Sequence, residues 1–285
     1  MLIFYKNLET LCKKVANKLS TKPYEIKIKK YHNGEYIINF KKNLINKKVT
    51  LFFNLCKPIN INIIKCNFII HFLKQAQAKT ITLISPYLGY CRQDRPNDSN
   101  NLIAAKLLAK LLESAGLNKI ITVDIHSEQI AGFYNIPLIN LKTTKIIQKL
   151  IKTTHAKIIF PDNGSSKRFR ALNKTAPYIF SKLRNKTHIT LSKTTPIPHS
   201  KVIIIDDIID TGTTLKATLT QLKSKCIYVY VSHITNYNAQ VIKHTKIKKI
   251  FTTNSIQNNN LYKKITQIDL STILLQKIQH DTSIY

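Results

Sequence analysis

Three acidic side chains lie close together in a chain that contains few of them. Asp206, Asp207 and Asp210 fall within five positions, whereas the whole chain has 14 Asp and Glu residues. They follow an apolar run at 202–205 that is typical of a buried parallel strand. The next residues, Thr211-Gly212-Thr213-Thr214, precede a helical pattern and offer N–H groups and hydroxyls. The spacing predicts a phosphate cradle beside carboxylates that hold sugar hydroxyls or magnesium. Alternatively, the aspartates are ordinary turn and N-cap residues.

Two further acids follow predicted strands. Asp162 comes directly after the apolar strand predicted at 157–160, and Asp124-Ile125-His126 follows the strand predicted at 119–123. In an extended segment residues two apart point the same way, so Asp124 and His126 could converge on one ligand. An Asp-x-His pair alone is weak evidence for a metal site, and it stays open at this point.

Basic residues occupy two other loop segments. Arg92 and Arg95 follow the strand predicted at 80–84, at the sheet edge where open α/β folds bind ligands. A guanidinium there can hold phosphate oxygens or stack on a base, or it can be a solvated surface charge. Lys182-Leu183-Arg184 begins a polar stretch that runs to Ser200. This stretch is predicted to be disordered or a mobile functional loop whose basic root closes over an anionic transition state.

Helices and strands alternate along the chain at the spacing of parallel sheets with crossover helices. Helices are predicted at 7–19, 62–76, 102–115, 144–153, 215–223 and 268–278, and strands at 24–30, 49–54, 80–84, 119–123, 157–160, 178–181, 202–205, 227–232 and 249–252. Asn33-Gly34 joins the run at 24–30 to a second alternating run that ends at Phe40, which by itself indicates only a hairpin turn. We expect an α/β fold with domains at 1–138 and 139–285, the C-terminal helix being free to pack back on the first.

Composition limits the class of protein. With 285 residues and 44% hydrophobic residues, the chain can build one large or two ordinary cores. No apolar run approaches a bilayer-spanning length, no signal-type segment is evident, and five widely spaced cysteines suit a reducing compartment. We therefore expect a cytoplasmic protein without a membrane partner.

The formal net charge of +31 raises the question of nucleic-acid binding. The lysines are scattered over the whole chain, without a dense basic tract or interleaved aromatic residues. Nucleic acid is therefore not the expected partner, although the surplus charge would attract nucleotides and sugar phosphates.

Taken together, these segments resemble the ribose-phosphate pyrophosphokinase family of the phosphoribosyltransferase superfamily. The resemblance covers nearly the whole chain and is carried by Pro86-Tyr87 through Arg95, Asp124-Ile125-His126 through Gln129-Ile130, Gly132-Phe133, Ile136-Pro137, Pro161-Asp162 with Gly164 and Arg168, and the segment 206–214. It implies two similar phosphoribosyltransferase-type α/β domains, each a mostly parallel sheet flanked by helices. It also implies a ribose-phosphate diphosphokinase, which transfers the β,γ-diphosphoryl group of MgATP to the 1-hydroxyl of ribose 5-phosphate.

The resemblance further implies roles for individual residues. ATP would be bound by Tyr31, Asn33, Gly34 and Glu35 of a neighbouring subunit and by Arg92 and Gln93 of the same chain. His126 and Asp162 match the family's Mg²⁺ ligands, Lys182 and Arg184 its catalytic cations. Ribose 5-phosphate would be held by Arg184, Asp206, Asp207, Asp210, Thr211, Gly212, Thr213 and Thr214. The ATP site shared between subunits implies a homo-oligomer, either a hexamer or an assembly built from dimers.

The chain departs from the family pattern in several places. Asn33 replaces the usual Asp of the adenine turn, and Ser165 and Thr213 replace glycines. The segment 96–100 lacks the usual basic residues, so regulation by phosphate and ADP is not expected to carry over. There are two alternative functions. A phosphoribosyltransferase that consumes phosphoribosyl pyrophosphate would need only the segment 206–214. A silent regulatory subunit should have lost Lys182, Arg184 or His126.

Overall fold

The computed structural model divides the chain into two compact units. One contains Met1–Leu141 and Asp269–Tyr285, and the other contains Lys142–Ile268. The structure describes residues 1–96, 101–175, 177–184, 189–193, 200–237, 240–257 and 262–282, with only the backbone at 173–175, 181–184, 189–193 and 280–282. Within this part of the chain, no helix is both long enough and apolar enough to cross a membrane.

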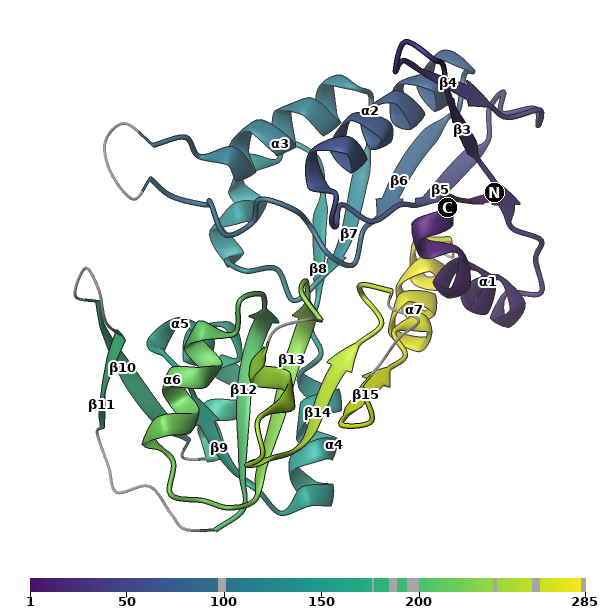
Figure 1. Cartoon of the computed structure of the whole chain (residues 1–285). Coiled ribbons are helices and arrows are strands. Elements are labelled where there is room, and N and C mark those ends of the chain that lie inside the picture. Colours follow the sequence, from purple (N-terminus) through teal and green to yellow (C-terminus); the bar gives the residue numbers. More distant parts are fainter. Residues whose placement is uncertain are drawn as a thin grey trace. The chain divides into compact units, whose positions relative to one another are not determined.

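The first unit is built on a six-stranded parallel sheet (Figure 1). Its strand order is β2-β1-β5-β6-β7-β8, and an antiparallel hairpin of β3 and β4 lies apart from it. The strands are β1 Leu2–Phe4, β2 Tyr24–Glu25, β3 Lys27–Lys30, β4 Tyr36–Asn39, β5 Lys48–Phe52, β6 Thr80–Ile84, β7 Lys119–Val123 and β8 Leu138–Leu141. The helices are η1 Lys6–Leu8, α1 Glu9–Lys18, α2 Ile59–Gln75, α3 Ala104–Ser114, η2 Glu128–Phe133 and α7 Ser271–Thr282.

Alternating side chains give this sheet two apolar faces. Ile3 and Leu51 pack in one core with residues of α2 and α3, whereas Leu2, Phe4 and Phe52 pack in another with α1 and α7. The C-terminal helix α7 is fixed to α1 by bonds from Lys14 to Asp269 and from Lys18 to Ser271 and Thr272. The last helix of the chain is therefore part of the first unit.

The second unit has a seven-stranded sheet in the order β11-β10-β9-β12-β13-β14-β15, in which only the β10–β11 pair is antiparallel (Figure 1). Its strands are β9 Lys157–Phe160, β10 Tyr178–Arg184, β11 Ile189–Lys193, β12 Val202–Ile209, β13 Ile227–Ile234, β14 Ile247–Thr253 and β15 Ile265–Ile268. Its helices are α4 Thr144–Thr154, α5 Asn163–Arg168, η3 Arg170–Thr175, α6 Thr213–Gln221 and η4 Gln240–Lys243. One core contains side chains of α6 and η4 and the other contains side chains of α4 and η3.

Two expectations about these strands are corrected by the structure. The polar stretch after Ser181 was expected to lack regular structure, but β10 runs on to Arg184 and pairs with β11. The central strand was expected to end at Ile205, but β12 continues to Ile209 because β13 runs beside it as far as Ile234. Asp206 and Asp207 therefore lie within the carboxyl-terminal half of a strand.

Gly89 is required by close packing in the first unit. A Cβ at this position would lie 2.8 Å from the carbonyl oxygen of Leu55 and 2.9 Å from Cγ2 of Ile59. Because a backbone oxygen cannot move away cheaply, Gly89→Ala should lower the free energy of unfolding by about 1–3 kcal/mol. Thermal unfolding measures this, with Gly132→Ala as the matched control because nothing lies within 4 Å of its added Cβ. Equal melting temperatures for the two variants would contradict the packing argument.

Candidate functional site

The loop after β12 has the geometry of a phosphate cradle. Gly212 is the N-cap of α6 and adopts a left-handed conformation with φ 80°, which costs a glycine little. Thr213 follows as the first residue of α6 and has no positive φ, so a β-branched side chain fits at this position. The hydroxyls of Thr211 and Thr213 lie 2.9 Å apart. The helix N-terminus and these hydroxyls together form donors suited to an anion.

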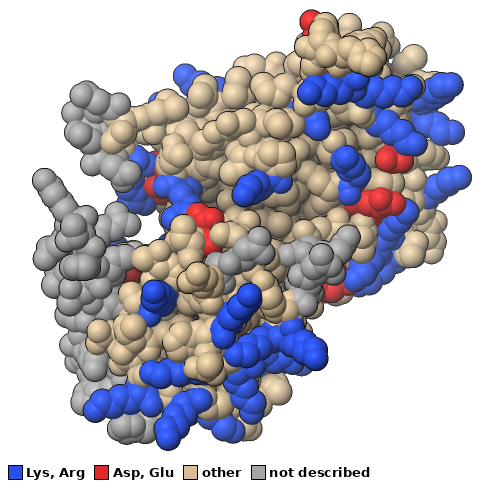
Figure 2. Space-filling model, in the orientation of Figure 1, with Lys and Arg blue, Asp and Glu red and all other residues tan. Residues whose placement is uncertain are grey.

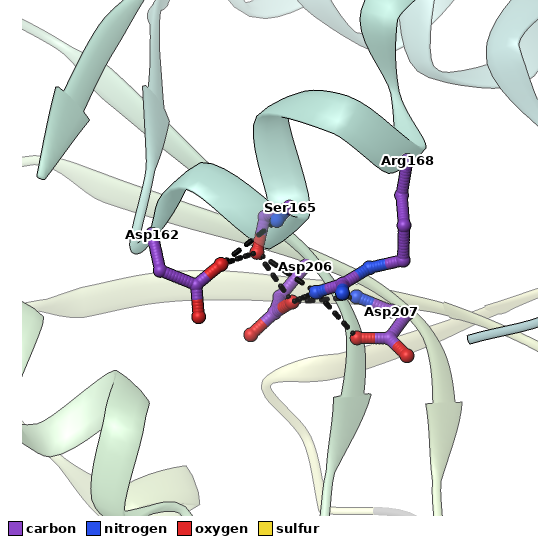
Figure 3. Close-up of polar contacts among 5 residues, drawn as sticks. All are labelled: Asp162, Ser165, Arg168, Asp206 and Asp207. Carbon is purple, nitrogen blue, oxygen red and sulfur yellow. Dashed lines mark hydrogen bonds and ion pairs between the residues drawn. The ribbon is translucent and has the colours of Figure 1, made fainter. Parts of the chain in front are cut away.

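Arg168 lies at the centre of the acidic cluster (Figure 3). Its Nη2 lies 2.8 Å from Oδ1 of Asp206 and 2.9 Å from Oδ1 of Asp207. The guanidinium side chain is only 14% exposed, the Asp206 side chain 15% and the Asp207 side chain 4%. One cation thus neutralises part of the charge of two largely buried carboxylates, and loss of this cation would leave both acids unpaired.

The helix α5 brings Asp162 into the same cluster. Asp162 is its N-cap, and Oδ1 accepts the backbone N–H of Ser165 at 2.8 Å. Gly164 permits this approach, because a Cβ there would lie 3.2 Å from Oδ1 of Asp162 and 3.1 Å from Nη1 of Arg168. The short helix therefore presents an acid at its first turn and the arginine at its last.

The Ser165 hydroxyl connects the two parts of the cluster. It lies 2.9 Å from Oδ1 of Asp162 and 2.8 Å from Oδ1 of Asp206, and it accepts a bond from Nη2 of Arg168 at 3.0 Å. The backbone N–H of Asp207 also donates to Oδ1 of Asp206, at 2.9 Å. A single oxygen of Asp206 thus receives three donors.

The second oxygens of Asp162 and Asp206 point to the same side of the cluster, away from the arginine (Figure 3). None of the described residues donates to either of them. Two outward oxygens from neighbouring strand ends can accept sugar hydroxyls or bind a hard cation. The geometry therefore favours Asp206 over the more buried Asp207 as the ligand-facing acid.

The charge balance of the cluster shifts the titration of Asp206. Burial, with Asp207 nearby, raises the pKa of Asp206 to about 7, although Arg168 opposes the change. The physical cause is that the Asp206 carboxylate is buried and lies close to the carboxylates of Asp207 and Asp162, whose charge one guanidinium offsets only in part. A positively charged ligand at the outward oxygens would favour the ionised form.

Asp210 lies one residue beyond β12, where it accepts a bond from the Thr235 hydroxyl at 3.1 Å. Thr214 lies in the first turn of α6. Both therefore belong to the same edge of the sheet as Gly212.

The predicted adenine turn is the connection between β3 and β4. The N–H of Tyr31 donates to Glu35 O at 2.8 Å, Gly34 has φ 98°, and Asn33 Oδ1 accepts the N–H of Glu35 at 3.2 Å. The Tyr31 residue is 53% exposed. Asn33 thus stabilises the turn through its amide oxygen, and the aromatic ring remains accessible to a ligand.

Arg92 and Gln93 both lie exposed after β6. Arg95, which is also exposed, makes a two-pronged bond to Asp94 at 3.0 and 2.9 Å. Asp94 is buried and also accepts from Gln129 at 3.0 Å. Arg95 is therefore held to the protein surface by its neighbour.

The backbone after β7 differs from the extended form assumed for Asp124 and His126. Asp124 has φ 41° and is 4% exposed, whereas His126 is half-buried. The strand ends at Val123 because the positive φ of Asp124 turns the chain out of the extended form. The bond from the N–H of Asp124 to Leu141 O, at 3.0 Å, is the last bond of the β7–β8 ladder. The assumption that the segment from Asp124 to His126 is extended is wrong.

Lys182 and Arg184 lie on β10, opposite Leu191 and Ile189 of β11. Their side chains fall outside the part of the chain that the structure describes. Among the described residues there is no group of three or more His, Cys, Asp or Glu side chains that could hold a metal.

Sequence reasoning assigned no role to Arg168 or Ser165. Arg168 was counted only as a matching residue of the Asp162 segment, and Ser165 only as a departure from it. The sequence feature that could have indicated them is their position on the short helix after Asp162, because a cation on that helix faces the end of the neighbouring strand. Their partner Asp206 lies 38 to 41 residues away, however.

The mostly parallel sheets flanked by helices, with acids and a glycine turn at the edge of the second, define an α/β protein of the phosphoribosyltransferase type. Residues 1–116 match the N-terminal domain of ribose phosphate pyrophosphokinase, and residues 134–261 match the phosphoribosyl transferase domain. The chain belongs to the ribose-phosphate pyrophosphokinase family. The predictions of this family, of the α/β fold class and of a diphosphokinase are confirmed.

Individual relatives agree with this assignment. The chain is 34% identical to a ribose-phosphate pyrophosphokinase of Mycoplasmopsis pulmonis over 96% of this chain and 90% of the relative. It is 32% identical to that of Bacillus caldolyticus over 86% and 82%. A crystal structure of phosphoribosylpyrophosphate synthetase from Mycobacterium smegmatis shares the fold with a TM-score of 0.90 at 22% identity, covering 100% of this chain and 99% of that one.

Proposed function

We propose that the protein transfers the β,γ-diphosphoryl group of MgATP to the 1-hydroxyl of ribose 5-phosphate, giving 5-phosphoribosyl 1-diphosphate and AMP for nucleotide biosynthesis. The observation that carries the proposal is the pair of outward oxygens of Asp162 and Asp206 beside the Gly212 turn. This edge offers both hydroxyl acceptors and an anion cradle, which are the two features that a sugar phosphate needs.

Ribose 5-phosphate would bind along this edge. The 5-phosphate would accept bonds from the N–H groups and hydroxyls of Thr211 to Thr214, with Gly212 at the turn. Asp206 would hold the ring hydroxyls through its outward oxygen, and Asp210 would complete the cradle. Asp207 would act chiefly as the buried partner of Arg168.

ATP would be bound by the exposed Arg92 and Gln93 and by the adenine turn of a neighbouring subunit, Tyr31 to Glu35. The attack of the 1-hydroxyl on the β-phosphorus releases AMP, so negative charge develops on the leaving oxygen. Lys182 and Arg184 of β10 would neutralise this charge. Such transfers depend mainly on positioning and on cations placed where charge develops.

The metal would be magnesium, held by His126 and Asp162 as the family resemblance implies. The Asp162 carboxylate, water and substrate phosphates would supply the oxygen ligands that magnesium usually takes. When bound, Mg²⁺ draws charge from the phosphate oxygens and makes the β-phosphorus easier to attack. Asp162 is prepared for this role, since its N-cap bond leaves one oxygen pointing outward.

A homo-oligomer, either a hexamer or built from dimers, would bring the adenine turn to the second subunit. An exposed apolar stripe supports assembly: Ile61, Ile64 and Phe68 of α2 are 44%, 48% and 45% exposed and lie on one helix face. Lysines and arginines are spread over the visible face of the protein in Figure 2 and do not form one tract. This distribution favours anionic small molecules over nucleic acid as partners.

The products of one reaction test the proposal. Incubation with Mg²⁺, ribose 5-phosphate and ATP labelled in the γ-phosphate should yield AMP and labelled 5-phosphoribosyl 1-diphosphate in equal amounts. Omission of ribose 5-phosphate is the control and should leave ATP intact. Formation of ADP would contradict diphosphoryl transfer. If the protein forms no AMP but consumes added 5-phosphoribosyl 1-diphosphate together with a base, the result would indicate a phosphoribosyltransferase. No activity in either assay would indicate a silent subunit.

A further inference from the structure

Ser165 is a buried hydroxyl between two ligand-facing acids, and the roles above do not use it. The residue is 0% exposed. Its Oγ lies within hydrogen-bond distance of Asp162, at 2.9 Å, and of Asp206, at 2.8 Å (Figure 3). These two acids come from different elements of the second unit, α5 and β12.

The hydroxyl is not needed to build either element. Asp162 already caps α5 through the backbone N–H of residue 165, which any amino acid except proline supplies. Asp206 is already held by Arg168 at 2.8 Å and by the N–H of Asp207 at 2.9 Å. The Ser165 hydroxyl therefore contributes a connection between the two carboxylates beyond what the fold requires.

The arginine directs this connection. Nη2 of Arg168 donates to Oγ of Ser165 at 3.0 Å, so the serine oxygen serves as an acceptor on that side. Its single proton then points to Oδ1 of Asp162 or of Asp206. Because either Oδ1 atom can accept this proton, both are favoured within hydrogen-bond distance of the one hydroxyl. This restricts the rotation of both carboxylates, and both second oxygens consequently keep their common direction.

We propose that Ser165 is a positioning residue, whose hydroxyl couples Asp162 to Asp206 and keeps their outward oxygens together where ribose 5-phosphate binds. The inference rests on the proposed function, since it assigns the ligand of that same edge. Ser165 itself touches no reacting atom, and it acts through the two acids.

The test compares Ser165→Ala and Ser165→Gly with the wild-type protein. Both variants lack the hydroxyl and keep the N–H that caps α5. Loss of a bond that orients a ligand-binding carboxylate should raise the KM for ribose 5-phosphate by on the order of tenfold, with kcat within about threefold. Calorimetric titration of ribose 5-phosphate, in the presence of Mg²⁺ and unreactive α,β-methylene-ATP, should show the same change in Kd.

Ser224→Ala is the matched control. Ser224 is 1% exposed, and its hydroxyl donates to Ser200 O at 2.8 Å and accepts the N–H of Cys226 at 3.2 Å, so the variant also loses hydroxyl bonds of a buried serine in the second unit. It should show a similar fall in melting temperature with an unchanged KM. A purely structural role of Ser165 would lower the amount of active enzyme, and hence kcat, without raising KM.

The outcomes separate the two proposals. The positioning role would be overturned if Ser165→Ala had the wild-type KM and Kd. A tenfold rise in KM only in Ser165→Gly would overturn it as well, because the backbone and not the hydroxyl would then matter. A wild-type protein that forms no AMP would overturn the proposed function, and the calorimetric Kd would still decide the role of Ser165.

Discussion

Arg168→Met is expected to lower the free energy of unfolding by about 3–5 kcal/mol, since removing one partner of a buried ion pair leaves the other charge unpaired. The guanidinium lies 2.8 and 2.9 Å from the carboxylates of Asp206 and Asp207 and is 14% exposed. In the variant, these two acids would face Asp162 with no cation between them. Chemical denaturation measures this loss of stability. The protein is kept metal-free so that no added cation neutralises the acids.

Two further substitutions define what Arg168 contributes. Arg170→Met makes the same change two residues along the chain at an exposed position and should change stability by less than about 0.5 kcal/mol. Arg168→Lys keeps the charge but loses the planar group that reaches Asp206, Asp207 and Ser165 together, so an intermediate stability is expected. If Arg168→Met is as stable as Arg170→Met, the guanidinium does not neutralise the cluster.

The fold could be predicted where one local pattern determines each element. The strands β5, β6 and β12 begin as short apolar runs followed by helical periodicity, and such a pattern specifies parallel pairing. The edge that carries Asp162 and the Gly212 turn follows from that pairing. The position of the acids near this edge was therefore predictable from the chain alone.

The details of the site depend on contacts that no local pattern contains. β12 extends through Asp206 and Asp207 because β13 provides a long partner, and β10 extends through Arg184 because β11 pairs with it. Asp124 leaves the strand with a φ of 41°, directly after the last backbone bond between β7 and β8. The network of Arg168 and Ser165 joins α5 to β12 across about forty residues, so its existence required the packed structure.

Asp206→Asn should reduce kcat/KM for ribose 5-phosphate by up to about a hundredfold, because a hydrogen bond to a charged group contributes roughly 1.5–3 kcal/mol. The substitution affects mainly one atom. The carboxamide oxygen can still accept from Arg168, Ser165 and the N–H of Asp207, as Oδ1 of Asp206 does now. The amide NH₂ then replaces the outward oxygen, which can no longer accept a ribose hydroxyl.

Asp207→Asn is the variant that distinguishes ligand binding from charge balance. Asp207 is 3% exposed and pairs with Arg168 at 2.9 Å, whereas the outward oxygen of Asp206 has no donor among the described residues. Asp206→Asn removes one negative charge from a crowded cluster, so it should lose activity while its stability is unchanged or higher. Asp207→Asn should lose less activity, because its carboxylate faces the arginine and not the ligand edge. Steady-state kinetics and thermal unfolding of both variants test this order, and the reverse order would assign the ribose hydroxyls to Asp207.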